Sequence, residues 1–258
     1  MTKPLALITG ASSGIGLEFS KLAVENGYDV ILVARRIDKL EALATMLRAQ
    51  GAMTYIYDYD LSLSDASITL HQQLMQAGLH PTLLINNAGF GDWQWFEKAD
   101  RSRLQEMIRL NIAALTELSH ACLPFMLSQK KGYILNIGST ASFIPGPGMA
   151  VYHATKAYVL SFTEALSEEL RGTGVQASVL CPGPTESEFQ AVARMEHSAL
   201  VKGKKLPTSA EVALYGWKQM MQGNTTIVHG AANQMVPFMT RIFPRSWVPK
   251  MVRKVYGI

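Results

Sequence analysis

Residues 152–156 read YHATK, so a tyrosine and a lysine stand four positions apart. On one helix their side chains share a face, with Cβ atoms about 5–6 Å apart. Tyrosine can exchange a proton with a substrate, but its ordinary pKa of about 10 suits neutral pH poorly. A neighbouring ammonium group favours the phenolate and lowers that pKa by roughly 1–3 units. The spacing therefore indicates a proton donor tuned by a cation, although it also recurs by chance in amphipathic helices.

His153 lies inside the same segment and is the residue type most often found as a catalytic base. One step along a helix, however, turns the next side chain by about 100°, so His153 points away from the face of Tyr152. We therefore expect His153 to be a surface or cleft-lining residue rather than a base.

Ser139 is a candidate for stabilising charge on a substrate oxygen. It ends the apolar run GYILNIGS (132–139), which predicts a strand, and open α/β sheets bind ligands at the carboxyl ends of their strands. A serine hydroxyl there can donate a hydrogen bond to a developing oxyanion. Thr140 and Ser142 follow closely and offer the same group, and Ser139 could instead merely open a turn.

Asn111 interrupts an otherwise apolar stripe on a helix predicted over residues 100–128. The stripe advances by alternating steps of four and three, as one helix face requires, through Leu104, Ile108, Asn111, Leu115, Leu118, Cys122 and Phe125. A buried amide without a hydrogen-bond partner is costly. Asn111 therefore either holds a water that relays protons to Lys156 or satisfies a locally distorted helix, and the two roles can coexist.

The wider pattern is that of an α/β fold in one domain, residues 1–258. Near-continuous apolar runs predict strands over 4–10, 28–35, 52–60, 81–89, 132–139, 174–183 and 225–230. Helical periodicity separates them, for example over 15–27, 36–50 and 64–78. Strands of this composition, alternating with helices, predict a doubly wound parallel sheet of about seven strands with helices on both faces.

The segment TGASSGIG (9–16) joins the first predicted strand to the first helix. Its glycines, Gly10, Gly14 and Gly16, permit a tight turn and close approach of the backbone to a pyrophosphate. The helix that follows offers free N–H groups and the positive end of its dipole to phosphates. An ordinary glycine-rich turn is the alternative, but the strand–turn–helix context favours a dinucleotide site.

The end of the second predicted strand bears on which dinucleotide binds. An NAD site places an acidic residue there to accept hydrogen bonds from the ribose, whereas this chain reads VARR, with Ala34 at that position. A guanidinium group can bind the 2′-phosphate of NADP(H). We expect NADP(H), with Arg35 as the main contact because it is nearer the strand. Arg36 could stack on the adenine or remain solvated.

Four motifs in register resemble the short-chain dehydrogenase/reductase family. They are TGASSGIG, NNAG (86–89), a serine 13 residues before the tyrosine of YHATK, and PGPT (182–185), and they cover about residues 5–190. The segments VARRIDKLEALA, NNAGFGDW and LNIGSTASF resemble the corresponding segments of bacterial oxidoreductases and of relatives of long-chain 3-oxoacyl reductases and hydroxysteroid dehydrogenases. The resemblance implies a Rossmann-type fold and an oxidoreductase that interconverts alcohols and ketones or aldehydes with NADP(H).

The resemblance also implies the roles of individual residues. The catalytic set would be Asn111, Ser139, Tyr152 and Lys156, with Tyr152 as the general acid and base and Lys156 also binding the nicotinamide ribose. Asp60 would contact the adenine, with Leu61 beside it. The remaining cofactor contacts would be Gly10, Ser12, Ser13, Gly14, Ile15, Gly16, Arg35, Arg36, Asn87, Ala88, Gly89, Pro182, Gly183 and Thr185. Many NADP-dependent members carry a basic residue where this chain has Ser13.

The substrate side is predicted to be apolar. Phe90, Trp93, Trp95 and Phe96 follow the fourth strand, and residues 185–207 correspond to a substrate lid. Aromatic walls suggest a hydrophobic carbonyl substrate, unless the tryptophans pack under their own loop. Two other functions stay open. One is a 3-oxoacyl-thioester reductase, for which Lys202, Lys204 and Lys205 could bind carrier or CoA phosphates, and the other is a catalytically idle NADP(H)-sensing protein.

Charge is uneven along the chain. Residues after Glu211 include six Lys or Arg and no Asp or Glu, which makes 230–258 a basic extension. It could contact a membrane surface, or pack on the body or on a second subunit, and Pro237, Pro244 and Pro249 argue against one long anchoring helix. Two cysteines, no signal-peptide core and no run of about 18 apolar residues indicate a cytoplasmic protein. We expect a homodimer or homotetramer, without a metal site or nucleic-acid partner.

Overall fold

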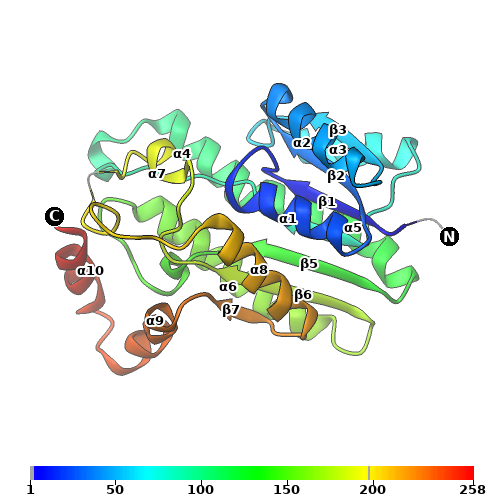
Figure 1. Cartoon of the computed structure of the whole chain (residues 1–258). Helices are drawn as coiled ribbons and strands as arrows, with labels where there is room; N and C mark the ends of the chain where they lie inside the picture. The colour runs from blue at the N-terminus through cyan, green and yellow to red at the C-terminus, as the bar shows by residue number, and fades with distance from the viewer. Residues whose placement is uncertain (1–2, 197) are drawn as a thin grey trace.

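The computed structural model of the chain describes residues 3–196 and 198–258 (Figure 1). Met1 and Thr2 of the predicted domain, and His197 of the predicted lid, lie outside the described residues. The described part forms a seven-stranded parallel sheet in the order β3-β2-β1-β4-β5-β6-β7. The strands are β1 (Leu5–Thr9), β2 (Asp29–Ala34), β3 (Thr54–Asp58), β4 (Leu83–Asn86), β5 (Gly132–Ile137), β6 (Val175–Cys181) and β7 (Thr226–Val228). Each of the seven predicted strands is present, and the predicted doubly wound α/β fold is confirmed.

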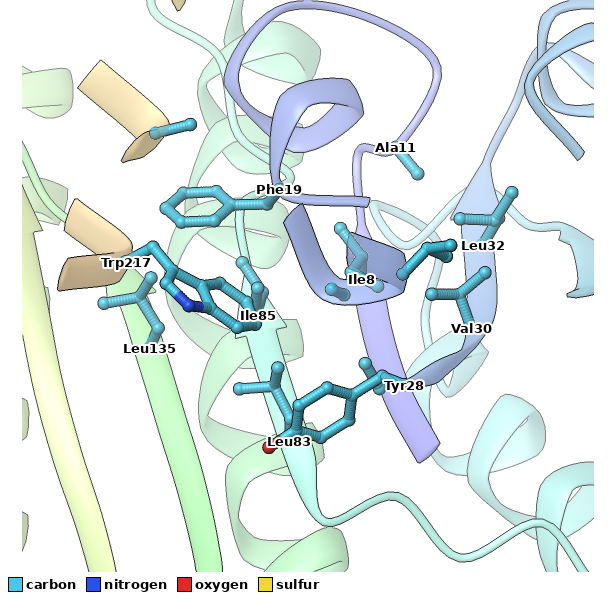
Figure 2. Packing of buried hydrophobic residues seen from close by; sticks show 14 of the residues in the cluster. Ile8, Ala11, Phe19, Tyr28, Val30, Leu32, Leu83, Ile85, Leu135 and Trp217 are labelled. Atoms are coloured by element: carbon cyan, nitrogen blue, oxygen red, sulfur yellow. The ribbon is translucent and has the colours of Figure 1, made fainter. Parts of the chain in front are cut away.

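Alternating side chains along each strand fill two separate cores. Ile8 of β1 faces one core, together with side chains from α1 (Gly14–Glu25), α2 (Ile37–Ala49) and α8 (Ser209–Met221). Its neighbour Leu7 faces the other core, with α3 (Ala66–Gln76), α5 (Leu115–Ser128) and α6 (Ala150–Glu169). Figure 2 shows the first core, in which Phe19 of α1 and Trp217 of α8 pack over Ile85 and Leu135 of the sheet. The helices therefore cover both faces of the sheet and hold the strand ends in place.

The crevice of the sheet lies where the chain reverses its direction of winding. β1 pairs with β2 on one side and with β4 on the other, so the connections that leave these two strands run to opposite faces. In doubly wound sheets such a switch point opens a crevice at the carboxyl ends of the strands. The glycine loop after β1 and the NNAG segment after β4 both lie at this point.

The helix predicted over 100–128 is interrupted. It consists of α4 (Arg101–Ile108), a π-helical stretch η2 (Arg109–Ala114) and α5. Taken together, residues 101–128 are long and apolar enough to cross a membrane by length and composition alone. Leu118, Cys122 and Met126 nevertheless pack in the second core, as a helix covering the sheet must.

Two further helices form the basic C-terminal extension. They are α9 (Ala231–Ile242) and α10 (Val248–Tyr256), and they lie at the margin of the molecule away from the N-terminus (Figure 1). Pro244 lies in the break between them, and Pro249 is in the first turn of α10. The extension is not one long helix, as predicted, although Pro237 lies inside α9 and does not interrupt it. Val248, Val252 and Tyr256 bury one side of α10, while no residue of α9 is fully buried.

Candidate functional site

An elongated cleft of about 650 Å³ runs across the carboxyl ends of the strands. At one end it reaches Arg36 and Asp60, and at the other it reaches α9 and α10. Most of the predicted site residues line it, namely Gly10, Ser12, Ser13, Gly14, Ile15, Arg35, Arg36, Asp60, Leu61, Asn87, Ala88, Gly89, Ser139, Tyr152, Lys156, Pro182, Gly183 and Thr185. Gly16 and Asn111 do not line the cleft themselves. The fold thus gathers into one cleft residues from segments far apart in the sequence.

The glycine loop has the backbone geometry that its sequence predicted. Gly10 and Gly14 have φ angles of 65° and 58°, a left-handed region that strains other residues. A side chain on Gly16 would collide with the Asn87 amide and with the Gly10 carbonyl oxygen. Ser13 is the N-cap residue of α1 but caps no backbone N–H with its side chain. The first turn of α1 therefore offers N–H groups to an anion.

Asn87 and Thr9 fasten the glycine loop to the end of β4. The Asn87 side-chain amide donates to the carbonyl oxygens of Thr9 and Gly10, at 3.0 and 3.1 Å. The Thr9 hydroxyl in turn accepts from the backbone N–H groups of Asn87 and Ala88, both at 3.0 Å. Asn87 and Ala88 therefore position the loop, in addition to lining the cleft.

Arg36, rather than Arg35, lies among hydroxyl groups at the cofactor end of the cleft. Its guanidinium donates to the Ser12 and Ser13 hydroxyls at 3.0 and 2.9 Å. The Arg35 side chain is 70% exposed and contacts only Asp60 among the acids of the described chain, at 3.6 Å. Arg36 is therefore the arginine held at the glycine loop, whereas the sequence favoured Arg35 for a phosphate contact. Arg35 also lines the cleft but is mostly exposed.

Glu188 and Lys39 complete this end of the cleft, and the sequence reasoning did not include them. The Glu188 carboxylate pairs with Arg36 at 2.8 Å and with Lys39 at 2.6 Å. Hydrogen bonds from these two cations hold the pKa of Glu188 at about 2, well below its ordinary value. Glu188 comes from the predicted lid, so the lid and the cofactor end of the cleft are joined by ion pairs.

Asp60 is held as a carboxylate in the cleft, next to Arg35. Burial would raise its pKa, but hydrogen bonds from Ser62 and the charge of Arg35 outweigh burial and lower it. The Ser62 backbone N–H and hydroxyl donate to one carboxylate oxygen at 2.9 and 2.6 Å. Leu61 is buried next to it. Asp60 therefore offers hydrogen-bond acceptors to the cleft.

Tyr152 and Lys156 come together on α6, as their spacing predicted. Both side chains are buried, and the Lys156 ammonium group lies 5.9 Å from the centre of the Tyr152 ring. Lys156 Nζ donates to the Ile137 carbonyl oxygen, at the end of β5, at 2.7 Å. Strand β5 thereby anchors the lysine next to the tyrosine.

The expected lowering of the Tyr152 pKa is wrong for this structure. Burial raises the pKa of Tyr152 to about 12, and a hydrogen bond with Ser139 offsets only part of that rise. Burial also lowers the pKa of Lys156 to about 8. The sequence argument counted only the charge of the lysine, whereas here the loss of hydration is the larger effect for both groups.

Ser139 is the hydroxyl, among the three candidates, that the structure links to Tyr152. It is the N-cap residue of η3 (Thr140–Phe143), and its oxygen accepts from the Ala141 backbone N–H at 3.1 Å. Ser142 is used differently, because its hydroxyl accepts from the Ser139 backbone N–H at 3.2 Å. Because the Ser139 oxygen accepts from the Ala141 N–H, its own O–H hydrogen remains able to donate toward the cleft.

Asn111 lies in the π-helical stretch and has hydrogen-bond partners on both sides of its amide. Its Nδ2 donates to the Phe90 carbonyl oxygen and to the Thr155 hydroxyl, both at 3.0 Å, and its Oδ1 accepts from the Phe90 N–H at 3.1 Å. The locally distorted helix proposed for it is therefore present. A Cβ on Gly89 would lie 3.0 Å from Asn111 Oδ1 and 3.5 Å from Lys156 Nζ, so Asn111 and Lys156 border the same space.

His153 is buried, which corrects its predicted place on the surface or the cleft wall. Only 2% of it is exposed. Its Nδ1 lies 2.6 Å from the Ile144 carbonyl oxygen, which can only accept, so Nδ1 carries the proton and Nε2 accepts from the Tyr256 hydroxyl at 2.7 Å. Burial lowers the pKa of His153, consistent with this neutral form. The imidazole ties α6 to α10, a contact between residues 103 positions apart.

The PGPT segment (182–185) after β6 is covered by Asn233 of α9. A side chain on Gly183 would collide with the Asn233 amide. Pro182 accepts from the Thr140 N–H at 2.9 Å, and the Thr185 hydroxyl donates to the Gly183 carbonyl oxygen at 3.0 Å. The PGPT segment is therefore fixed to η3 on one side and covered by α9 on the other.

The apolar wall differs from the one expected. Of the four aromatic residues after β4, Phe90 lines the cleft, whereas Trp93 packs on Tyr256 with ring centres 5.1 Å apart. Trp95 and Phe96 are partly exposed outside the cleft. Phe189, Met195 and Leu200 of the predicted lid line the cleft as expected, and the rest of the wall consists of Met149, Met239, Phe243, Val252 and Tyr256. Several of these belong to α9 and α10, whose position over the cleft had no signal in the sequence.

Comparisons with known proteins agree with this architecture. Residues 4–198 match the profile of the short chain dehydrogenase family. The sulfoacetaldehyde reductase of Chromohalobacter salexigens is 33% identical over 240 residues, which cover 91% of this chain and 93% of that protein. A short-chain dehydrogenase from Sphingobium yanoikuyae in complex with NADPH superposes with a TM-score of 0.83 at 30% identity, covering 92% of this chain and 93% of that one.

A second solved structure, a short-chain dehydrogenase/reductase from Burkholderia phymatum in complex with NAD, superposes with a TM-score of 0.81 at 26% identity and covers 91% and 92% of the two chains. Both nicotinamide dinucleotides thus occur among similar structures, which supports a dinucleotide without choosing between them. The family match spans most of the chain and includes the glycine loop, Ser139, Tyr152 and Lys156. The chain therefore belongs to the short-chain dehydrogenase family and is an oxidoreductase that acts on alcohol and carbonyl groups.

Proposed function

We propose that the protein is an NADP(H)-dependent carbonyl reductase that also catalyses the reverse alcohol oxidation, with Tyr152 as the general acid and base. The observation that carries this proposal is the convergence of Ser139, Tyr152 and Lys156 at one end of a dinucleotide cleft. We also infer a cytoplasmic homo-oligomer. The two buried free thiols, Cys122 and Cys181, support a reducing compartment.

NADP(H), when bound, supplies the hydride that is transferred to the carbonyl carbon or accepts it in the reverse direction. In our proposal the Ser139 hydroxyl donates a hydrogen bond to the substrate oxygen and stabilises the charge that develops there. Tyr152 gives its phenolic proton to that oxygen. With a pKa of about 12, Tyr152 remains protonated across the physiological range, which suits the reduction of a carbonyl.

Lys156 positions the reacting groups and supplies positive charge. Its ammonium group is held by the Ile137 carbonyl oxygen and lies next to the space kept open by Gly89. A water held between Lys156 and the region of Asn111 would replenish the proton of Tyr152, and both residues border that space. Removing Asn111 would therefore affect proton supply as well as the fold.

NADP(H) is proposed over NAD(H) because of the cations at the adenosine end. Arg36, supported by the Ser12 and Ser13 hydroxyls, and Lys39 can bind a 2′-phosphate, while Ala34 offers no carboxylate to the ribose. The left-handed Gly10 and Gly14, together with the uncapped first turn of α1, fit the pyrophosphate. The residues present therefore fit the adenosine and pyrophosphate parts of the cofactor.

The substrate is proposed to be a hydrophobic ketone or aldehyde. Methionine, leucine, phenylalanine and valine side chains line the far end of the cleft, and the described residues of α9 and α10 that line it are all uncharged. A 3-oxoacyl thioester is the second candidate, favoured by the exposed lysines Lys202, Lys204 and Lys205 of the predicted lid. Acetoacetyl-CoA assayed against hydrophobic ketones separates the two classes.

The deciding experiment is a panel of carbonyl compounds assayed by NADPH oxidation, with wild type compared with Tyr152→Phe. Loss of the general acid should lower kcat by about 10²–10⁴-fold. NADPH binding, followed by fluorescence, should be nearly unchanged, because the phenylalanine keeps the shape of the cleft. An undiminished kcat would refute the role of Tyr152. Tight NADPH binding without turnover of any carbonyl would favour a cofactor-sensing protein instead.

A further inference from the structure

Exposed apolar side chains gather on α9 and on the break that follows it. On α9 they recur at steps of three and four, so they share one helix face. Ile242 is the most exposed, at 76%. We call the following residues the C-terminal patch: Met235, Phe238, Met239, Ile242, Phe243 and Trp247. Apolar residues exposed singly are ordinary, but a contiguous group of this kind marks an interaction surface.

The charges around the C-terminal patch are all positive. Arg241 and Arg245 lie within its sequence span, and Lys250, Arg253 and Lys254 follow on α10; all five are exposed. No acidic residue follows Glu211 in the chain. None of the ion pairs formed within residues 3–196 and 198–258 involves these five cations. Arg253 donates to an Ile258 oxygen at 3.1 Å, whereas the other four cations have no ion-pair partner among the described residues. The patch therefore combines apolar side chains with an excess of positive charge.

This combination favours an anionic lipid surface over a second copy of the chain. A two-fold symmetric dimer joins the same surface of both subunits, so the cations of the patch would face their own copies. Helices that lie in a membrane interface have Phe and Trp on the apolar face and Lys or Arg on the polar face, as α9 and the break after it have. The break at Pro244 lets the two helices lie along one surface without forming a spanning helix.

We propose that the C-terminal patch docks the protein on anionic lipid membranes. Phe238, Ile242 and Trp247 enter the boundary between headgroups and acyl chains, while the nearby cations contact the headgroups. This docking does not depend on the proposed reaction. Phe238, Ile242 and Trp247 also lie outside the lining of the cleft, so they can be changed without altering the site.

The test is co-sedimentation of the full chain with phosphatidylcholine vesicles that contain either no phosphatidylglycerol or about 30% of it, at low and high salt. We expect binding to the anionic vesicles that weakens with salt. Arg241→Gln, Arg245→Gln and Lys250→Gln together should lower the partition coefficient on the order of a hundredfold, since each cation contributes about fivefold. Phe238→Ser with Ile242→Ser should also lower it, while NADPH binding stays as in wild type.

A matched control is Lys202→Gln, Lys204→Gln and Lys205→Gln, which removes the same charge outside the patch and should leave most of the binding. A second readout is the quenching of Trp247 fluorescence by brominated lipids, with Trp247→Phe as its blank. Equal losses of vesicle binding in the control and patch variants would overturn the proposal. A wild-type protein that does not bind anionic vesicles would overturn it as well. Dissociation of an oligomer by Phe238→Ser, with vesicle binding unchanged, would assign the patch to a second copy.

Discussion

Glu188 binds Arg36 through an ion pair of 2.8 Å, at the place where a 2′-phosphate would be held. Its carboxylate therefore competes with that phosphate for the guanidinium. Glu188→Gln removes the negative charge, so we expect the KM for NADPH to fall severalfold and the KM for NADH to change little. Steady-state kinetics with both cofactors measure this. A rise in the KM for NADPH would mean that Glu188 supports the bound cofactor instead of competing with it.

Arg36 and Arg35 should differ in their effect on cofactor choice. Arg36→Ala removes a guanidinium held among the Ser12 and Ser13 hydroxyls, and charge-assisted hydrogen bonds of this kind are worth about 1.5–3 kcal/mol. We expect kcat/KM for NADPH to fall roughly tenfold to a hundredfold, with a small change for NADH. Arg35→Ala is the matched control, because that side chain is mostly exposed. Equal losses in the two variants would contradict the assignment of the phosphate to Arg36.

The pH dependence of carbonyl reduction should report Lys156 rather than Tyr152. Reduction needs Tyr152 protonated, which holds up to its pKa of about 12, and Lys156 charged, which holds below its pKa of about 8. We expect kcat/KM to be level below pH 8 and to fall about tenfold per unit above it. Lys156→Arg keeps its charge throughout, so its profile should lose the break even at a lower maximum. A break that stays at pH 8 in Lys156→Arg would belong to another group.

Asn111→Leu should destabilise the protein as well as slow it. The leucine would leave the Phe90 N–H and C=O groups without their present partner in a partly buried place, where the cost is at the lower end of roughly 1–3 kcal/mol for each group. We expect the free energy of unfolding, measured by urea denaturation, to fall by about 2–4 kcal/mol. Thr116→Val in α5 removes the hydrogen bonds of its hydroxyl with the Ile112 carbonyl oxygen and with the exposed Tyr158 hydroxyl, and should change the free energy of unfolding by less than about 0.5 kcal/mol. Unchanged stability of Asn111→Leu would show that Phe90 finds other partners.

The sequence predicted the strands well because a parallel strand buried on both faces must be apolar along its length, as Val30–Val33 of β2 are. It also placed Tyr152 and Lys156 correctly on one face, since their relation depends on helix geometry alone. Asn111 was recognisable because it breaks an apolar stripe. These features are local, and a short stretch of sequence contains everything that determines them.

The errors concern contacts between distant segments. His153 was expected at the surface or on the cleft wall because nothing near it in the sequence reveals Tyr256 as its partner. Glu188 was not considered, since its ion pair with Lys39 spans 149 positions. The pKa of Tyr152 was given the wrong direction because its sign depends on burial, which the spacing of two residues does not contain.

Side chains at the end of α9 and just after it contribute both to the cleft and to the exposed surface of the molecule. Met239 and Phe243 both line the cleft and belong to the exposed C-terminal patch. A substitution that widens the cleft at either position therefore also changes the exterior. Engineering of substrate range at these two residues would carry a linked change in solubility and surface binding, so variants selected for one property need to be assayed for the other.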